Sequence, residues 1–124
     1  MSKIVLWVSD MDAQIDFYAN LLGLKVEMLN DGFAALSSET NTLLLHELPI
    51  DDRAVVPIVS QLPALEEVAI KPVFLVDNIA VARGAVEGSL ATFPRDQLVH
   101  GSSTYLDVID PEGNVIQIEQ KTIR

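Results

Sequence analysis

The stretch DPEGNVIQIE, residues 110–119, combines a tight turn with the strand that follows it. Aspartate, proline and glycine occupy the first, second and fourth positions of the turn, where a type I turn favours them. Strand-forming residues precede the turn at 104–109 and continue after it at 114–120. The stretch therefore predicts an antiparallel hairpin near the end of the chain.

The beginning of the chain predicts a strand and a helix. Residues 3–8 alternate between two faces, with Ile4, Leu6 and Val8 on one and Lys3, Val5 and Trp7 on the other. The helix predicted over 12–22 starts at a cap formed by Ser9 or Asp10 and ends at Gly23. Strands are expected at 24–29, 33–37 and 42–46, with a hairpin turn at 30–32. The order is βαβββ.

The second half of the chain repeats this order. We expect a strand at 73–76, a helix capped by Asp77 or Asn78 and ended by Gly88, a strand near 90–93, a loop over 94–101, and the closing hairpin. A constant offset of 68 residues pairs Lys3 with Lys71, Leu6 with Phe74 and Val8 with Val76. The chain is therefore interpreted as one unit used twice. Prolines and acidic residues break the pattern over 49–70, which we interpret as a connector.

Composition limits the classes of function. The chain has 124 residues, 49% of them hydrophobic, which predicts a single compact domain over 1–124. It has no cysteine, which excludes disulfides and thiolate metal sites and fits a cytoplasmic protein. A formal net charge of −10 disfavours nucleic acid as a partner. The apolar runs are too short for a membrane span or a signal segment, so no membrane association is expected.

Two motifs resemble those of a known family. FYANLLGL, residues 17–24, and DPEGNVIQIE, residues 110–119, are similar to the helix exit and the closing hairpin of the vicinal oxygen chelate superfamily. That superfamily contains glyoxalase I, extradiol dioxygenases, fosfomycin-resistance transferases and bleomycin-binding proteins. The resemblance implies an α+β fold in which two βαβββ modules form a half-open curved sheet around a central cup. The modules would span about 1–48 and 71–124.

The resemblance also implies where metal-dependent members bind a divalent ion. The four ligand positions fall on Lys3, His46, Lys71 and Gln117. A protonated lysine has no lone pair to donate, so this set is poor for a metal. The favoured prediction is that the protein uses no cofactor. The alternative is a divalent metal held by His46, Glu119 and His100.

Several residues are candidates for binding a small molecule in the cup. Trp7 and Tyr105 could supply aromatic faces. Lys3 and Lys71 could bind an anionic ligand. The simpler interpretation is that each amine lies in water at the rim or pairs with Asp107 or Glu119. His46 could bind a ligand or act as an acid or base, and it could equally be a hydrogen-bonded histidine at a strand end. The predicted ligand-binding set is Lys3, Trp7, His46, Lys71, Tyr105, Gln117 and Glu119.

Three functions follow from these residues. The first hypothesis is metal-independent binding of a small molecule by a homodimer similar to the bleomycin-resistance branch. The second is a metal-dependent lyase or dioxygenase resembling glyoxalase I. The third is an enzyme without a cofactor, with His46 as the catalytic base and Lys71 stabilising an oxyanion. The sequence leaves open whether the protein is catalytic, and whether its cavity favours cations or anions.

Overall fold

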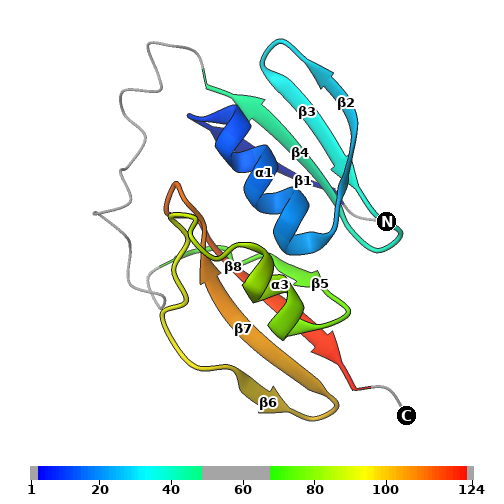
Figure 1. Cartoon of the computed structure of the whole chain (residues 1–124), viewed down its shortest axis with the longest axis vertical. Helices are drawn as coiled ribbons and strands as arrows, with labels where there is room; N and C mark the ends of the chain where they lie inside the picture. The colour runs from blue at the N-terminus through cyan, green and yellow to red at the C-terminus, as the bar shows by residue number, and fades with distance from the viewer. Residues whose placement is uncertain (1–2, 49–67, 123–124) are drawn as a thin grey trace.

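The computed structural model describes residues 3–48 and 68–122 (Figure 1). Most of the predicted connector therefore lies outside the described residues. The first module consists of β1 (Ile4–Val8), α1 (Met11–Leu22), β2 (Lys25–Asn30), β3 (Phe33–Ser37) and β4 (Thr42–Glu47). Its four strands form a sheet in the order β1-β4-β3-β2, with β1 parallel to β4. The predicted βαβββ order is confirmed here.

The second module has the same architecture. It consists of β5 (Val73–Leu75), α3 (Ile79–Ala85), β6 (Leu98–His100), β7 (Ser103–Ile109) and β8 (Val115–Lys121). The sheet order is β5-β8-β7-β6, and β5 runs parallel to β8. Each position in this order matches the corresponding strand of the first module. The structure therefore confirms an α+β fold built from a duplicated unit.

One predicted strand was wrong. The strand expected near 90–93 is reduced to a single bridge between Thr92 and Ile109, and β6 forms instead at Leu98–His100. Gly101 has a φ of 62°, and the short turn at 101–102 lets His100 pair directly with Ser103. The tight turn therefore selects the segment that pairs with β7. The apolar residues Ala91 and Phe93 pack against the core without joining the sheet.

The ends of α1 match the sequence prediction closely. The Asp10 side chain accepts a hydrogen bond from the backbone N–H of Ala13, and Gly23 ends the helix with a φ of 66°. Asn78 caps α3 in the same way, by accepting from Val81. The predicted end of this helix at Gly88 was wrong, because α3 ends at Ala85 and is shorter than α1.

Each sheet has one face against the helices and one open face, defined here as the face away from them. In β1, the side chains of Ile4, Leu6 and Val8 pack into the core, whereas Val5 and Trp7 are 47% and 56% exposed. The predicted division of this strand is therefore correct. The fully buried leucines of the first sheet are Leu36, Leu43 and Leu45.

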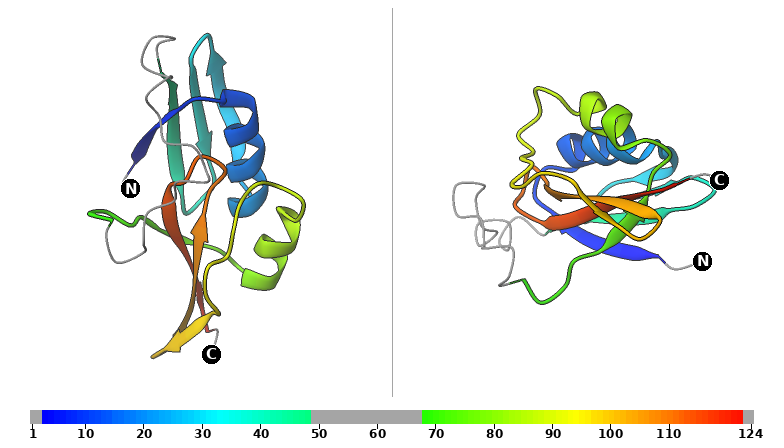
Figure 2. Two further views of the ribbon diagram at one scale, coloured as in Figure 1. Left: turned by 90° about the vertical axis from the view of Figure 1, so that its left-hand side faces the viewer. Right: turned by 90° about the horizontal axis from the view of Figure 1, so that it is seen from below.

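The two modules meet through their helices and turns. Figure 2 shows α1 and α3 together on one side of the sheets, and the two helices contact each other. The β3–β4 turn of the first module contacts β5, because the Asn41 side chain donates a 2.8 Å hydrogen bond to the carbonyl of Leu75. The open faces consequently lie on the opposite side of the molecule from the helix pair. Among the described residues, no helix is long and apolar enough to cross a membrane.

Candidate functional site

The register of the strands defines equivalent positions on the two open faces. In the first sheet, Leu44 pairs with Val5 and Ala35, and His46 pairs with Trp7 and Phe33. In the second sheet, the equivalent position to Leu44 is Gln117, which pairs with Val73 and Asp107. Glu119, which pairs with Leu75 and Tyr105, is equivalent to His46. Therefore the first open face is apolar and aromatic, whereas the second is polar and charged.

An aromatic cluster, defined as Trp7, Phe33 and His46, occupies the first open face. The Trp7 and His46 rings lie 4.9 Å apart between centroids and are tilted by 43°. The Phe33 ring meets the other flank of His46 edge-on, at 4.8 Å. These three residues come from adjacent strands β1, β4 and β3. They form a platform against which a flat or apolar group could pack.

A charged cluster, defined as Lys71, Arg95, Asp107 and Gln117, occupies the second open face. Asp107 is only 4% exposed, and its Oδ1 accepts a 2.9 Å hydrogen bond from Gln117 Nε2. Lys71 Nζ lies 3.2 Å from the same oxygen, and Arg95 Nε lies 3.6 Å from Oδ2. Pairing of this kind is what allows a carboxylate to remain buried. The interpretation of Lys71 as a partner of Asp107 therefore agrees with the structure.

The remaining predicted residues of the second sheet lie close to one another. Glu119 Oε2 accepts a 2.6 Å hydrogen bond from Ser103 Oγ, and Tyr105 is the direct register partner of Glu119. His100 is exposed at the end of β6, where it pairs with Ser103. The structure thus brings Tyr105 and Glu119 together on the second open face.

Lys3 differs from Lys71 although the two are equivalent in the repeat. Each lysine precedes the first strand of its module and is exposed, but Lys71 is paired with Asp107. The position equivalent to Asp107 is Ala35, and the position equivalent to Gln117 is Leu44. The first sheet therefore lacks, at these positions, the buried carboxylate and the amide that hold Lys71.

The donor set on the open faces does not fit a divalent metal. Within residues 3–48 and 68–122, no three His, Cys, Asp or Glu side chains gather closely enough to hold a metal ion. The alternative set of His46, Glu119 and His100 is thus not assembled. At the positions implied by the resemblance, Lys3 and Lys71 are cations, and Gln117 already donates to Asp107. Lysine and glutamine are poor ligands for transition metals.

The closing turn fixes the second module to α1. The buried Oδ2 of Asp110 accepts hydrogen bonds from Tyr18, Gln14 Nε2 and Asn114 Nδ2. Burial raises the pKa of the Tyr18 hydroxyl well above its ordinary value, and the neighbouring charge of Asp110 raises it further. Tyr18 therefore remains a hydrogen-bond donor at all physiological pH values.

Glu112 makes a second contact between the same turn and α1. Its carboxylate accepts hydrogen bonds of 2.8 to 3.0 Å from the backbone N–H groups of Ser9 and Asp10, at the start of α1. Desolvation raises the pKa of Glu112 more than these hydrogen bonds lower it, so the pKa is raised overall. The contacts of Asp110 and Glu112 therefore orient the two open faces relative to each other.

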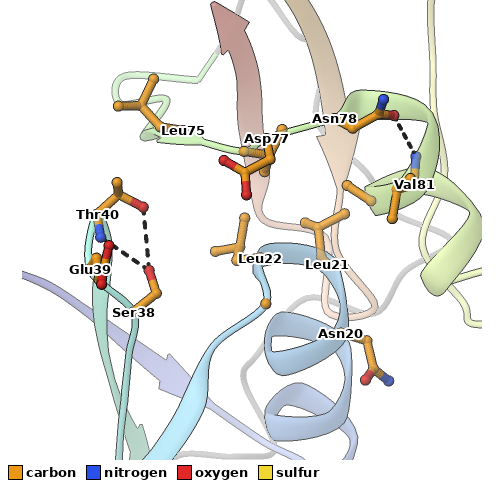
Figure 3. A pocket seen from close by; sticks show the side chains of 13 residues that line it. Asn20, Leu21, Leu22, Ser38, Glu39, Thr40, Leu75, Asp77, Asn78 and Val81 are labelled. Carbon is orange, nitrogen blue, oxygen red and sulfur yellow. Dashed lines mark hydrogen bonds between the residues drawn. The ribbon is translucent and has the colours of Figure 1, made fainter.

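A separate pocket of about 490 Å³ lies between the modules, outside the predicted site (Figure 3). It is bounded by the end of α1, the β3–β4 turn and the start of α3, with Leu21, Leu22, Glu39, Asp77 and Asn78 among the residues around it. None of the predicted ligand-binding residues lines this pocket.

Comparisons with known proteins agree on the fold. The Glyoxalase/Bleomycin resistance protein/Dioxygenase superfamily model matches residues 1–118. A glyoxalase/bleomycin resistance protein from Albidiferax ferrireducens T118 is 16% identical, with a TM-score of 0.70 and 98% of each chain covered. A bleomycin resistance determinant encoded on the transposon Tn5 is also 16% identical, with a TM-score of 0.63, covering 99% of this chain and 98% of its own. A comparison with curated protein sequences gives no match.

The match over nearly the whole chain identifies the class, a βαβββ-repeat protein of the glyoxalase fold. The chain belongs to the Glyoxalase/Bleomycin resistance protein/Dioxygenase superfamily. The family resemblance that the two sequence motifs predicted is confirmed. The structural neighbours establish the fold alone, because their identities to this chain are low.

Proposed function

We propose that this protein binds a small molecule on its open sheet faces without a metal ion. The observation that carries the proposal is the Lys71–Asp107–Gln117 network, which occupies the second open face where metal-dependent members would be expected to place ligands. The salt bridge and the hydrogen bond both engage the Asp107 carboxylate, which would otherwise be available to an ion. The residues favour recognition of a ligand by polar contacts over Lewis-acid chemistry.

The aromatic cluster supports the binding of an organic ligand. Trp7, the only tryptophan in the chain, is 56% exposed. A half-exposed tryptophan beside Phe33 and His46 offers a flat surface of the kind found in ligand sites. The charged cluster offers hydrogen-bond donors on the other sheet. Together the two faces suit a ligand with both an apolar part and a polar part.

We further propose a homodimer, in which a second copy of the chain partly covers the open faces and leaves the ligand site accessible. Val5 and Val73 are each 47% exposed at equivalent positions of the two sheets, and Trp7 extends the apolar surface of the first. Apolar sheet faces of this kind favour association because burying them removes apolar area from water. Sedimentation analysis at micromolar concentration should give the mass of a dimer, and a monomeric mass would contradict this part of the proposal.

A fragment-binding experiment tests the proposal. Protein treated with a chelator is screened by ligand-observed NMR against a library of small aromatic and aliphatic fragments. The expected result is binding that Trp7→Ala weakens and that the chelator leaves unchanged. Val99→Ala is the control, because Val99 is 68% exposed and pairs with Thr104, whose side chain lies on the opposite face of β7 from Tyr105.

The metal-dependent alternative makes the opposite prediction. A lyase or dioxygenase using His46 would lose metal and turnover together in His46→Ala. Fragments that bind only after a divalent metal is added, and that are lost with His46→Ala, would overturn the proposal. Binding that responds equally to Trp7→Ala and Val99→Ala would place the site elsewhere.

A further inference from the structure

We infer that the pocket between the modules is a second binding site, which takes a small organic amine that carries a positive charge and an apolar group. This pocket of about 490 Å³ lies between the end of α1, the β3–β4 turn and the start of α3, and it shares no residue with the aromatic cluster or the charged cluster. The inference therefore goes beyond the proposed function, and neither depends on the other.

The two junctions between the modules are equivalent in the repeat, and the interior of one of them is filled. In this filled junction the β7–β8 turn contacts α1, and Gln14 and Tyr18 both donate hydrogen bonds to the Asp110 carboxylate. All three side chains are buried. A pocket of about 420 Å³ lies beside these groups, next to Asp16 and Glu87.

The other junction, between the β3–β4 turn and α3, has smaller side chains and is open. The offset of 68 residues makes Ala82 of α3 equivalent to Gln14 of α1. Ser38 begins the β3–β4 turn, as Asp110 begins the β7–β8 turn. Ala82 and Ser38 both line the 490 Å³ pocket. An alanine in place of a glutamine and a serine in place of an aspartate therefore leave the space that forms this pocket.

The lining of the open junction includes a large apolar part. Leu21, Leu22 and Ala82 form its floor and are nearly fully buried, whereas Val81 at its rim is 70% exposed. A ligand that packs against Val81 removes apolar surface from water, which favours binding. The volume is in the range of small-molecule sites. The pocket therefore suits a ligand with an apolar group.

The rim of the open junction carries negative charge. Glu39 and Asp77 are the ionisable side chains among the described residues that line the pocket, and both are exposed. Figure 3 shows the Asp77 carboxylate directed into the space between the β3–β4 turn and Leu22. Lys121 lines a smaller adjoining pocket that shares Asp77, but the two form no ion pair in the part of the chain that the structure describes. Two carboxylates at the rim, and a net charge of −10, favour a cation.

The other polar groups of the pocket indicate which class of cation fits. Within residues 3–48 and 68–122, no three His, Cys, Asp or Glu side chains gather closely enough to hold a metal ion. An ammonium group needs no such set, because its N–H groups donate to carboxylate, amide and hydroxyl oxygens alike. Asn20 and Thr40 line the pocket and add such oxygens. An organic amine therefore matches both the rim and the apolar floor.

The experiment uses benzylamine, which is cationic at neutral pH, and its neutral isostere benzyl alcohol as probes. Each is titrated into the full-length protein at constant ionic strength, and binding is followed by the NMR shifts of the backbone N–H groups of Gly23, Thr40 and Val81. The indole N–H of Trp7 reports separately on the open faces. Benzylamine should shift the three pocket signals, and benzyl alcohol should bind at least about threefold more weakly.

Two aspartate substitutions separate recognition at the pocket from a general effect of charge. Asp77→Asn keeps the size of the side chain, and it should weaken benzylamine binding by about three- to fivefold while leaving benzyl alcohol unchanged. Asp31→Asn is the matched control, because Asp31 is an exposed aspartate in the β2–β3 turn, at the opposite end of β3 from the pocket. It should leave the binding of both probes unchanged.

A third substitution tests the cavity itself. Ala82→Leu adds three carbon atoms at the pocket floor and should weaken the binding of both probes. Should this buried substitution prevent folding, the two aspartate variants still decide the question, because Asp77 and Asp31 are exposed. Unchanged affinity in folded Ala82→Leu would contradict binding in this pocket.

The location of the shifts and the role of charge can each overturn the inference. Equal affinity for benzylamine and benzyl alcohol would do so, as would equal losses in Asp77→Asn and Asp31→Asn. Shifts confined to Trp7 would place the amine on the open faces. Shifts confined to Asp16 and Glu87 would place it beside the filled junction, and either location contradicts a site between the β3–β4 turn and α3.

Discussion

The hydroxyl of Tyr18 donates a 2.6 Å hydrogen bond to Oδ2 of Asp110, a residue 92 positions further along the chain. Tyr18 lies on α1 of the first module, and Asp110 begins the turn between β7 and β8 of the second. Both residues are fully buried. The bond therefore joins the two modules, and it helps to set how the aromatic and the charged open faces are placed relative to each other.

Replacing Tyr18 with phenylalanine should destabilise the protein. The substitution removes a buried hydrogen bond to a charged carboxylate and leaves the ring in place. We expect the free energy of unfolding to fall by about 1.5–3 kcal/mol. Urea denaturation followed by circular dichroism measures this change.

Tyr105→Phe is the matched control for this substitution. Tyr105 lies on the open face of β7 and is only partly buried. Removing the Tyr105 hydroxyl should therefore change the free energy of unfolding by less than about 0.5 kcal/mol. Equal effects of the two substitutions would contradict the role assigned to the bond between Tyr18 and Asp110.

The contact of Glu112 with α1 should make stability depend on pH. Desolvation raises the pKa of the Glu112 carboxyl in the folded protein, and the charges of Asp110 and Asp10 raise it further. The hydrogen bonds from Ser9 and Asp10 lower this pKa, but by less. The folded state then holds the proton more strongly than the unfolded state. The stability contributed by this group is present below the unfolded pKa of 4.5 and is lost as the pH rises through the higher folded pKa.

The comparison of wild type with Glu112→Gln isolates this contribution. The difference in unfolding free energy, wild type minus variant, should decrease as the pH rises from below 4.5 to neutral. Chemical denaturation at a series of pH values gives both curves. A difference that stays constant or increases over this range would show that the pKa of Glu112 is not raised on folding.

Trp7→Ala should separate binding from stability. Because Trp7 is half-exposed on the open face, we expect a loss of unfolding free energy of about 1 kcal/mol or less. Leu45→Ala, on the buried face of the neighbouring strand β4, should cost about 2–5 kcal/mol. Ligand-observed NMR with a bound fragment should show the opposite order, with the larger loss of affinity in Trp7→Ala. The same order in both measurements would assign Trp7 to the core.

The sequence predicted the fold well because the signals for its elements are local. Alternation divided β1 correctly, and Asp10, Gly23 and the turn at 110–113 each have residue types that specify a cap or a turn. β6 was missed because its position depends on the turn at Gly101 and on pairing with β7, and three exposed residues carry no periodic signal.

The candidate site was predicted in part, for a related reason. Strand alternation placed Trp7, His46, Lys71 and Gln117 on the open faces, and the pairing of Lys71 with Asp107 was anticipated. Phe33 and Arg95 were not identified. Phe33 joins the aromatic cluster through its register with His46, which a register analysis of the β3–β4 hairpin could have found. Arg95 reaches Asp107 from a loop, and no pattern in the sequence indicates that contact.

The central claim, that the open faces bind a ligand without a metal, is tested most directly by measuring metal content and binding on the same sample. Protein purified without chelator is analysed for divalent metals by elemental analysis, and its affinity for a fragment from the screen is measured before and after dialysis against a chelator. We predict far less than one metal ion per chain and an unchanged affinity. One bound metal per chain, together with affinity that the chelator abolishes and the metal restores, would contradict the account.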